Sequence, residues 1–412
     1  MKLLRCASFA GACALAAMLS AASAAETGHW VASWFSSQQL TEPGNLPPAP
    51  GLTGCTLRQV VCPTLAGDRV RVTFSNVFGR GAVMIAAAHL ADSAGGAAIL
   101  PATDEALTFS GSASVTIEAG ASVVSDEIPF KLAARSNLAV SIVLGNVPAD
   151  LTGHPGSRTT SFILPGDAVA AADLPGAAHV DHWYLLSEID VRTTQPAAAV
   201  VVLGDSITDG RGSTTNANDR WPDQLARRLA ASPATANIAV LNAGLGGNRL
   251  LREGLGPSAL ARFDRDVLAP AGVKWLIVLE GVNDLGTAVG ARAQHGPGAS
   301  AGDVIAGLHQ LIVRAHAHHI RVYGGTITPW TGFTMYHTPE SEAERQAVNR
   351  WIRTGGEFDA VIDFETAMRE PGEPVRLAAP FDCGDHLHPS PAGHAALAGA
   401  VDLRLLTLTP GN

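Results

Sequence analysis

The sequence has no excess of basic residues and few cysteines, and beyond its first residues it has no long apolar run. Its 28 Lys and Arg against 37 Asp and Glu give a net charge of −9. A nucleic-acid-binding surface needs basic residues to neutralise phosphates, so this balance argues against such a partner. Later apolar stretches, such as 273–279, have strand length and are too short to span a bilayer. We therefore expect neither nucleic-acid binding nor stable membrane insertion of the mature chain.

The first 24 residues have the pattern of a secretory signal peptide. Lys2 and Arg5 precede an apolar stretch from Cys6 to Leu19, and Ala22-Ser23-Ala24 supplies small residues for a signal peptidase. A membrane anchor is disfavoured because this stretch is shorter than the roughly 20 residues that cross a bilayer. Removal of the leader takes away two basic residues and no acidic residue, which moves the net charge to −11. We expect cleavage after Ala24 and a secreted or periplasmic protein.

Few cysteines remain once the leader is removed. They are Cys55, Cys62 and Cys383. Cys55 and Cys62 are close in sequence, and an oxidising compartment favours a disulfide between them. Cys383 is then left alone, and we interpret it as a partly buried structural cysteine in preference to a reactive thiol.

The hydrophobic pattern divides the chain near 193–196. Upstream, alternating runs such as 69–74, 113–117 and 138–143 are separated by Gly, Asn, Asp and Pro clusters. This pattern is typical of an antiparallel, sandwich-like fold. A length of 412 residues also suggests two domains. We predict a β-rich domain over residues 25–195, with substrate targeting as a function to test, and a second domain over 196–412.

The second domain alternates strand-length apolar runs with amphipathic segments. Strands are predicted at 198–203, 238–242, 275–280, 322–327 and 360–363. Helices are predicted at 221–231, 303–319, 342–353 and 391–406. This alternation predicts an α/β fold with a mostly parallel sheet covered on both faces. Ligands bind outside the carboxyl ends of such strands, so the residues that follow each strand are the candidates for a site.

Polar and glycine-rich blocks follow several of these strands. The first strand runs into Gly204-Asp205-Ser206, which places a hydroxyl on a tight strand-to-helix turn. Such a serine is either a nucleophile or a simple helix N-cap. The later blocks are the glycine-rich 242–249, the segment 280–284 with Asn283, and the Asp/His cluster 382–389. Together they offer a hydroxyl, backbone amides, a side-chain amide and an acid–base pair.

These blocks resemble the GDSL, or SGNH, family of secreted ester hydrolases. The resemblance covers about half of the chain, roughly 200–405, and Ile207 stands where the family name has leucine. The matching residues are Gly204-Asp205-Ser206, Gly247, Gly281 with Asn283, and Asp385 followed by His388 and Pro389. It implies a three-layer α/β/α domain of flavodoxin-like type. Trp30-Val31-Ala32-Ser33-Trp34 resembles the β-rich N-terminal region of certain two-domain bacterial members.

The resemblance also implies residue roles. Ser206 is the expected nucleophile, His388 the base that takes its proton, and Asp385 the residue that orients the imidazole. The backbone amides of Ser206 and Gly247 with the Asn283 side chain are the expected oxyanion hole. Ester hydrolysis of this kind needs no metal or organic cofactor, and none is expected.

Three other interpretations involve neighbouring residues. His386 and Asp382 are a rival acid–base pair, but the resemblance favours His388 and Asp385. The same cluster could suggest a metal site, but its ligands would have to converge within very few residues. Arg249 and Trp330 follow strand-end turns and are candidate substrate contacts, with loop packing as the alternative.

The expected substrate is an ester of a small molecule or a polysaccharide. Export, acidity and the lack of a long apolar lid helix favour short acyl groups, such as acetyl groups on a glycan. A lipase or lysophospholipase is the alternative enzyme. A carbohydrate-binding surface protein without catalysis is the alternative of another class. The sequence gives no indication of the oligomeric state.

Overall fold

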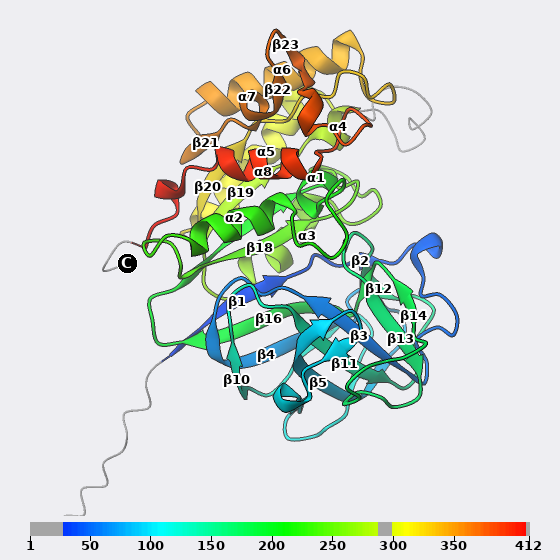
Figure 1. Cartoon of the computed structure of the whole chain (residues 1–412). Coiled ribbons are helices and arrows are strands. Elements are labelled where there is room, and N and C mark those ends of the chain that lie inside the picture. Colours follow the sequence, from blue (N-terminus) through cyan, green and yellow to red (C-terminus); the bar gives the residue numbers. More distant parts are fainter. Residues whose placement is uncertain (1–27, 287–298, 409–412) are drawn as a thin grey trace, which may run out of the picture.

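The structure is a computed structural model that describes residues 28–286 and 299–408. The predicted signal peptide, residues 1–24, lies outside these ranges. Figure 1 shows a β-rich region, here residues 28–193, below an α/β region that begins at residue 198. The prediction of separate domains meeting at 195/196 stays a prediction, although the architecture changes between these two regions.

The β-rich region is built from antiparallel sheets. The first has the order β1-β16-β4-β10, with β9 beside β4; its strands are β1 (His29–Phe35), β16 (Leu186–Thr193), β4 (Gly67–Ser75), β10 (Ile128–Leu132) and β9 (Ser122–Val124). The second is ordered β14-β13-β3-β11-β5-β6, with β7 and β8 also on β5; its strands are β14 (Ala178–Val180), β13 (Ser161–Pro165), β3 (Cys55–Val61), β11 (Leu138–Leu144), β5 (Val83–Gly95), β6 (Ala98–Ile99), β7 (Glu105–Leu107) and β8 (Val115–Ile117). A small sheet joins β15 (Trp183–Tyr184), β12 (Thr152–His154) and β2 (Gln39–Leu40).

The α/β region contains a five-stranded parallel sheet of order β18-β17-β19-β20-β21. Its strands are β18 (Ile238–Gly244), β17 (Ala198–Gly204), β19 (Val273–Leu279), β20 (Arg321–Gly325) and β21 (Ala360–Ile362). Counted within this region the order is 2-1-3-4-5, the flavodoxin-like arrangement. The predicted fold class, a parallel α/β sheet preceded by an antiparallel β-rich region, is confirmed.

Helices cover both faces of this sheet (Figure 1). The longer ones are α2 (Trp221–Ala230), α5 (Ala301–Ala317), α6 (Pro339–Thr354) and α8 (Pro391–Ala400). The shorter ones, which the periodicity did not predict, are α1 (Ser206–Asp209), α3 (Ala259–Phe263), α4 (Val282–Gly286) and α7 (Phe364–Met368), with a hairpin of β22 (Arg369–Glu370) and β23 (Glu373–Leu377). Successive residues of β17 belong to different buried clusters: Val200 shares one with residues of α2 and α8, whereas Val201 shares the other with residues of α5 and α6.

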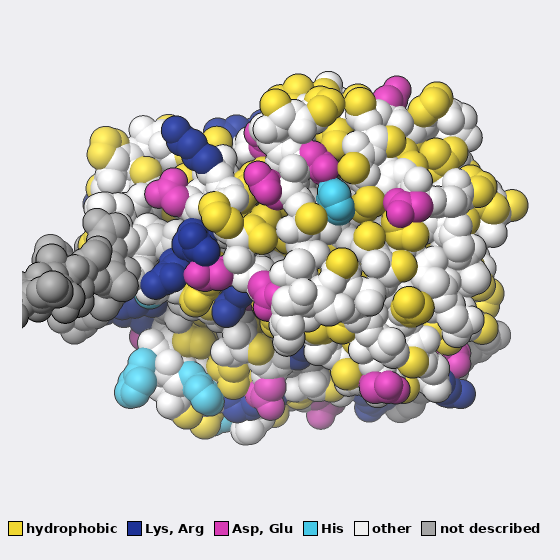
Figure 2. Space-filling view, turned by 90° about the horizontal axis from the view of Figure 1, so that it is seen from below, with side chains coloured by type: hydrophobic (Ala, Val, Ile, Leu, Met, Phe, Trp, Pro, Cys, Tyr) yellow, Lys and Arg dark blue, Asp and Glu magenta, His cyan; other side chains and the backbone are white. Residues whose placement is uncertain are grey.

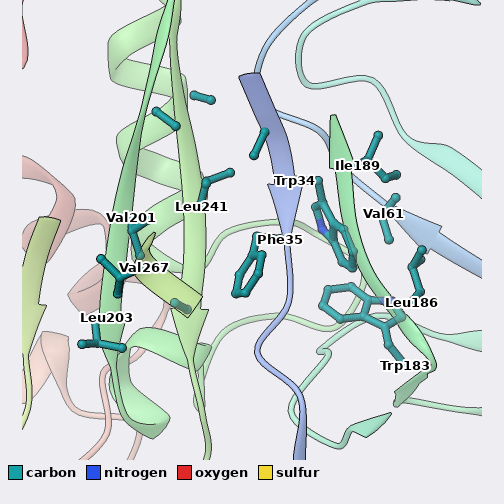
Figure 3. Close-up of a cluster of buried hydrophobic side chains, with 14 of the residues drawn as sticks. Trp34, Phe35, Val61, Trp183, Leu186, Ile189, Val201, Leu203, Leu241 and Val267 are labelled. Carbon is teal, nitrogen blue, oxygen red and sulfur yellow. The ribbon is translucent and has the colours of Figure 1, made fainter. Parts of the chain in front are cut away.

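Strand β1 joins the two regions through its side chains. Figure 3 shows Trp34 directed toward Trp183 and Leu186 of the β-rich region, and Phe35 directed toward the parallel sheet. The Trp34 and Trp183 rings meet edge to face, with centroids 5.0 Å apart at 83°. Residues of both regions therefore belong to one continuous hydrophobic core.

The predicted disulfide between Cys55 and Cys62 is wrong, since both thiols are free. Cys55 begins the extended strand β3 and Cys62 follows its last residue. At about 3.3 Å per strand residue they lie roughly 20 Å apart, whereas a disulfide needs Cα atoms within about 7 Å. Closeness in sequence therefore did not give closeness in space.

The outer face of the β-rich region has a mixed surface. Figure 2 views the molecule from this side and shows acidic and basic side chains interspersed with uncharged ones. Among the described helices, none combines the length and apolar character that a bilayer crossing requires.

Candidate active site

Ser206 lies on the turn between strand β17 and helix α1. The Asp205 side chain caps this helix, because its Oδ1 accepts the Ile207 N–H at 2.8 Å. The turn is tight: a Cβ on Gly204 would lie 2.1 Å from Thr208 Oγ1. Ser206 is the first residue of α1, so its own N–H has no acceptor within the helix. The hydroxyl and a backbone donor without an acceptor inside the helix therefore stand at the carboxyl end of β17.

The structure joins Ser206, His388 and Asp385 in one chain of hydrogen bonds. Ser206 Oγ lies 2.8 Å from His388 Nε2, and His388 Nδ1 lies 2.6 Å from Asp385 Oδ2. The backbone N–H of His388 also donates to Asp385 Oδ1 at 2.8 Å. Because a carboxylate accepts hydrogen bonds, Nδ1 carries the proton and Nε2 faces the hydroxyl as an acceptor. This geometry allows His388 to take the Ser206 proton.

The electrostatics of this pair suit a neutral base beside an ionised acid. Burial, opposed by Asp385, lowers the pKa of His388 below 6.5. Although burial raises the pKa of Asp385, the hydrogen bonds that it accepts from His388 outweigh this effect and hold its pKa well below 3.8. At neutral pH the imidazole is therefore unprotonated on Nε2 and the carboxylate is charged.

The rival residues form a separate pair on the same loop. His386 Nδ1 lies 2.6 Å from Asp382 Oδ2, and the His386 side chain is half exposed. His388, by contrast, is buried and contacts Ser206. The structure thus distinguishes the two histidines by the partner that each one reaches.

Cys383 is exposed, so its interpretation as a partly buried residue is wrong. Among the described residues, Asp382, Cys383 and Asp385 offer ligand atoms within 4.8 Å of one another. The two carboxylates already accept hydrogen bonds from His386 and His388. The carboxylate oxygens that could bind a metal ion here therefore already accept hydrogen bonds from histidines.

The other blocks approach the serine turn through backbone and side-chain hydrogen bonds. Leu245 N–H donates to Gly204 O at 3.0 Å, which ties the glycine-rich turn after β18 to the nucleophile strand. Gly247 adopts φ +67°, a conformation that favours glycine. The Asn283 side-chain amide, on α4, donates to Asn248 O at 2.8 Å. Gly247 and Asn283 are thus held beside one another at the same sheet edge.

Tyr336 orients the Asn283 amide. Its hydroxyl donates to Asn283 Oδ1 at 2.8 Å, and its side chain is buried. This bond fixes the oxygen toward Tyr336 and the nitrogen toward the glycine-rich turn. Tyr336 belongs to no recognisable motif, and no sequence signal pointed to it.

Arg262 is a second residue that sequence reasoning missed. Its fully buried guanidinium donates to Gly204 O, Ala243 O and Asn248 Oδ1 at 2.7–3.0 Å, and pairs with Asp266 at 2.9 Å. It thereby connects the ends of β17 and β18 beneath the site. Burial raises the pKa of Asp205 to about 7 even though Arg262 opposes this effect. No sequence signal indicated that Arg262, in a short helix, would connect the ends of these two strands.

The two predicted substrate contacts are both buried. Trp330 is 0 % exposed and packs in the core, with the Arg345 guanidinium 5.7 Å from its ring centroid. A substrate cannot reach this ring, so that prediction is wrong and the alternative of packing holds. Arg249 is also buried, and its charge acts on Asp284. Its contact with substrate stays a prediction.

Residues 202–396 match the model of the GDSL-like Lipase/Acylhydrolase family. No curated protein sequence matches the chain. Similar solved structures include an acetylxylan esterase from Geobacillus stearothermophilus, with 21 % identity, 52 % of this chain and 95 % of that chain covered, and a TM-score of 0.40. Another is a GDSL-like lipase from Bacteroides thetaiotaomicron, with 18 % identity, 50 % and 88 % coverage, and a TM-score of 0.36.

The family match spans the serine turn, the glycine-rich turn, Asn283 and the His388 loop. Residues 28–193, upstream of it, form the separate β-rich region. Over residues 202–396 the chain belongs to the GDSL-like lipase/acylhydrolase family and is a carboxylic ester hydrolase of that family.

Proposed function

We propose that Ser206 is the nucleophile of this hydrolase and that His388 and Asp385 activate it. Ser206 Oγ attacks the ester carbonyl carbon while His388 Nε2 takes the hydroxyl proton. The tetrahedral intermediate collapses, and His388 passes the proton to the leaving alcohol. Water then attacks the acyl-enzyme in the same way and releases the carboxylic acid. The observation that carries this proposal is the chain of 2.8 and 2.6 Å hydrogen bonds from Ser206 to Asp385.

The oxyanion hole of the proposed reaction consists of three donors. These are the backbone N–H groups of Ser206 and Gly247 and the side-chain amide of Asn283. Their support is the position of Ser206 at the start of α1 and the bonds that Tyr336 and Asn248 make to Asn283. Donors fixed in advance stabilise the developing negative charge without reorganisation.

The proposed substrate is an ester with a short acyl group, such as an acetyl group on a glycan. Ser206 is only 8 % exposed, which favours a small acyl group. Leu255 is 59 % exposed and lies against Gly247. Its side chain offers a small apolar surface that suits a short acyl chain. The half-exposed His386 and the Arg211 guanidinium, 3.9 Å from Asp385, provide polar groups that suit a hydroxyl-rich alcohol.

A series of p-nitrophenyl acetate, butyrate, octanoate and palmitate, with acetylated xylan in parallel, tests both parts of the proposal. We expect kcat/KM to be highest for acetate or butyrate, and acetate to be released from the polysaccharide. Ser206→Ala should lower turnover more than about 10³-fold while the circular dichroism spectrum stays native.

The other outcomes are equally informative. A maximum at octanoate or longer would show a lipase-type acylhydrolase. Failure of the wild type to hydrolyse any of these esters would favour a carbohydrate-binding protein without catalysis. Near-normal turnover in Ser206→Ala would remove Ser206 from the mechanism.

We further propose that the protein acts outside the cytoplasm, in the periplasm or medium. The support is the signal-like pattern of residues 1–24. Mass spectrometry of the exported protein should find an N-terminus at Ala25. An intact Met1 in that fraction would contradict the cleavage.

A further inference from the structure

We propose that His154, from the β-rich region, positions the catalytic turn by holding Asp209, the last residue of helix α1. The β-rich region would then be part of the catalytic machinery and more than a targeting module. The inference rests on the proposed role of Ser206, which begins the same helix.

The contact between the two regions at this point is short and buried. His154 Nε2 lies 2.8 Å from Asp209 Oδ1, and both side chains are at most 4 % exposed. His154 Nδ1 lies 2.7 Å from Ser37 O, in the connection between β1 and β2. The imidazole stacks on Trp183, with ring centroids 5.6 Å apart at 28°. The ring is therefore fixed on both edges and on one face.

The partners of His154 define where its protons lie. A backbone carbonyl only accepts hydrogen bonds, so Nδ1 must donate to Ser37 O. A bond between Nε2 and a carboxylate oxygen also needs a proton between the two atoms. Asp209 Oδ2 is buried and has no hydrogen-bond partner within the described part of the chain. The hydrogen bond with His154 therefore compensates a buried carboxyl group whose desolvation would otherwise be costly.

Glycines allow the surrounding backbone to close on Asp209. A Cβ on Gly156, two residues after His154, would lie 1.7 Å from Asp209 Oδ2. A Cβ on Gly244, at the end of β18, would lie 2.2 Å from the Asp209 nitrogen. The β-rich loop and the parallel sheet thus confine Asp209 from separate directions, and neither contact tolerates a side chain without movement.

Helix α1 transmits the position of Asp209 to Ser206. It has four residues and makes too few internal hydrogen bonds to hold its shape alone. Asp209 N–H donates to Asp205 O, and the Ser206 carbonyl accepts from Gly210 and Arg211. Asn242 and Trp221 fix Thr208 from the α/β region, while His154 fixes Asp209 from the β-rich region. A shift of Asp209 therefore moves Ser206 relative to His388.

The test compares His154→Gln with His89→Gln in the full chain. His89 Nδ1 pairs with Asp104 Oδ2 at the same 2.8 Å, but within the β-rich region and away from α1. The readouts are kcat and KM for p-nitrophenyl acetate and the rate of Ser206 labelling by a p-nitrophenyl phosphonate. We expect His154→Gln to lower kcat and the labelling rate together by about 10- to 100-fold, with KM changed less than about threefold. His89→Gln should leave all three values near wild type.

Asp209→Ala provides a second variant if His154→Gln fails to fold, because it removes the buried carboxylate together with its desolvation penalty. It should also lower kcat by about tenfold or more. Combining it with His154→Gln should add little, since both remove the same contact. Native kcat and labelling rates in a folded variant of either residue, even with a lower Tm, would overturn the inference. Absence of label on Ser206 in the wild type would instead contradict the proposed function itself.

Discussion

In the α/β region, the blocks with Ser206, Gly247 and Asn283 follow parallel strands whose carboxyl ends lie at one sheet edge. In the β-rich region, His154, held by Ser37 O, contacts Asp209 at the end of helix α1 from antiparallel strand and loop ends. Parallel strands bring successive blocks together by topology. Antiparallel strands give no such rule, so their contribution depends on how the sheets pack against the second region.

The two regions also use buried arginines differently. Arg262 in the α/β region pairs with the carboxylate of Asp266 as well as with strand-end carbonyls. Arg58 in the β-rich region donates to Ser141 Oγ and to the carbonyls of Ala97 and Ala171. The first residue therefore balances a buried charge, while the second satisfies loop carbonyls.

The largest expected effect concerns these two arginines. Arg262→Met should lower the free energy of unfolding by about 3–5 kcal/mol, because it removes one of the two arginines that pair with the buried Asp266 and also leaves strand-end carbonyls without their donor. Arg58→Met should cost about 1–3 kcal/mol, because it leaves carbonyls without donors. Urea unfolding measures both values. Equal losses would contradict the distinction between charge balance and carbonyl satisfaction.

Substitution of two buried asparagines, one in each region, distinguishes an effect on catalysis from an effect on stability. Asn283→Ala should lower kcat about 10²–10³-fold, because it removes one oxyanion donor. Asn76→Ala is the matched control in the β-rich region, where the side chain donates to Gly81 O and Ile117 O. It should reduce stability by about 1–3 kcal/mol and leave kcat unchanged. A kcat for Asn283→Ala within threefold of wild type would exclude Asn283 from the oxyanion hole.

The smallest expected effect is the pH dependence of kcat/KM, which should arise from His388 in the α/β region. His388 must be unprotonated to act as a base, so kcat/KM should rise with pH and reach its plateau. Because burial lowers the pKa of His388, the midpoint should lie below pH 6.5 in the free enzyme. Initial rates at subsaturating ester between pH 4 and 8 measure it.

Two other acids, Asp205 and Glu188, provide controls for that profile. Burial raises the pKa of Asp205 to about 7 and that of Glu188, in β16, well above 4.5. For both groups the folded state retains a proton that the unfolded chain loses, so stability falls as pH rises from about 4 toward the raised pKa. Asp205→Asn and Glu188→Gln should reduce this loss of stability and keep the rate midpoint below 6.5. A midpoint that moves with either variant would show that the acid controls the rate.

Sequence reasoning located the strands and longer helices of the α/β region within a few residues, except that the last helix, predicted at 391–406, ends at Ala400. Apolar runs of strand length and periodic helices such as 303–319 are local features, and α5 at Ala301–Ala317 follows from them. A helix was expected after the Ser206 turn, but the bounds of the one-turn α1 were not predicted because four residues carry no periodicity. The disulfide between Cys55 and Cys62 was wrongly predicted because the extended strand β3 lies between them and keeps the two residues far apart.

The sequence by itself determined the α/β fold, the family, and the set of blocks that meets at the sheet edge, because periodicity and strand order are encoded locally. Only the tertiary structure decided that His388 and not His386 reaches Ser206, and that Trp330 is buried. It also decided that His154, 55 residues away in the chain, contacts Asp209. These outcomes depend on the packing of side chains from distant segments, where differences of a few ångströms select one neighbour over another.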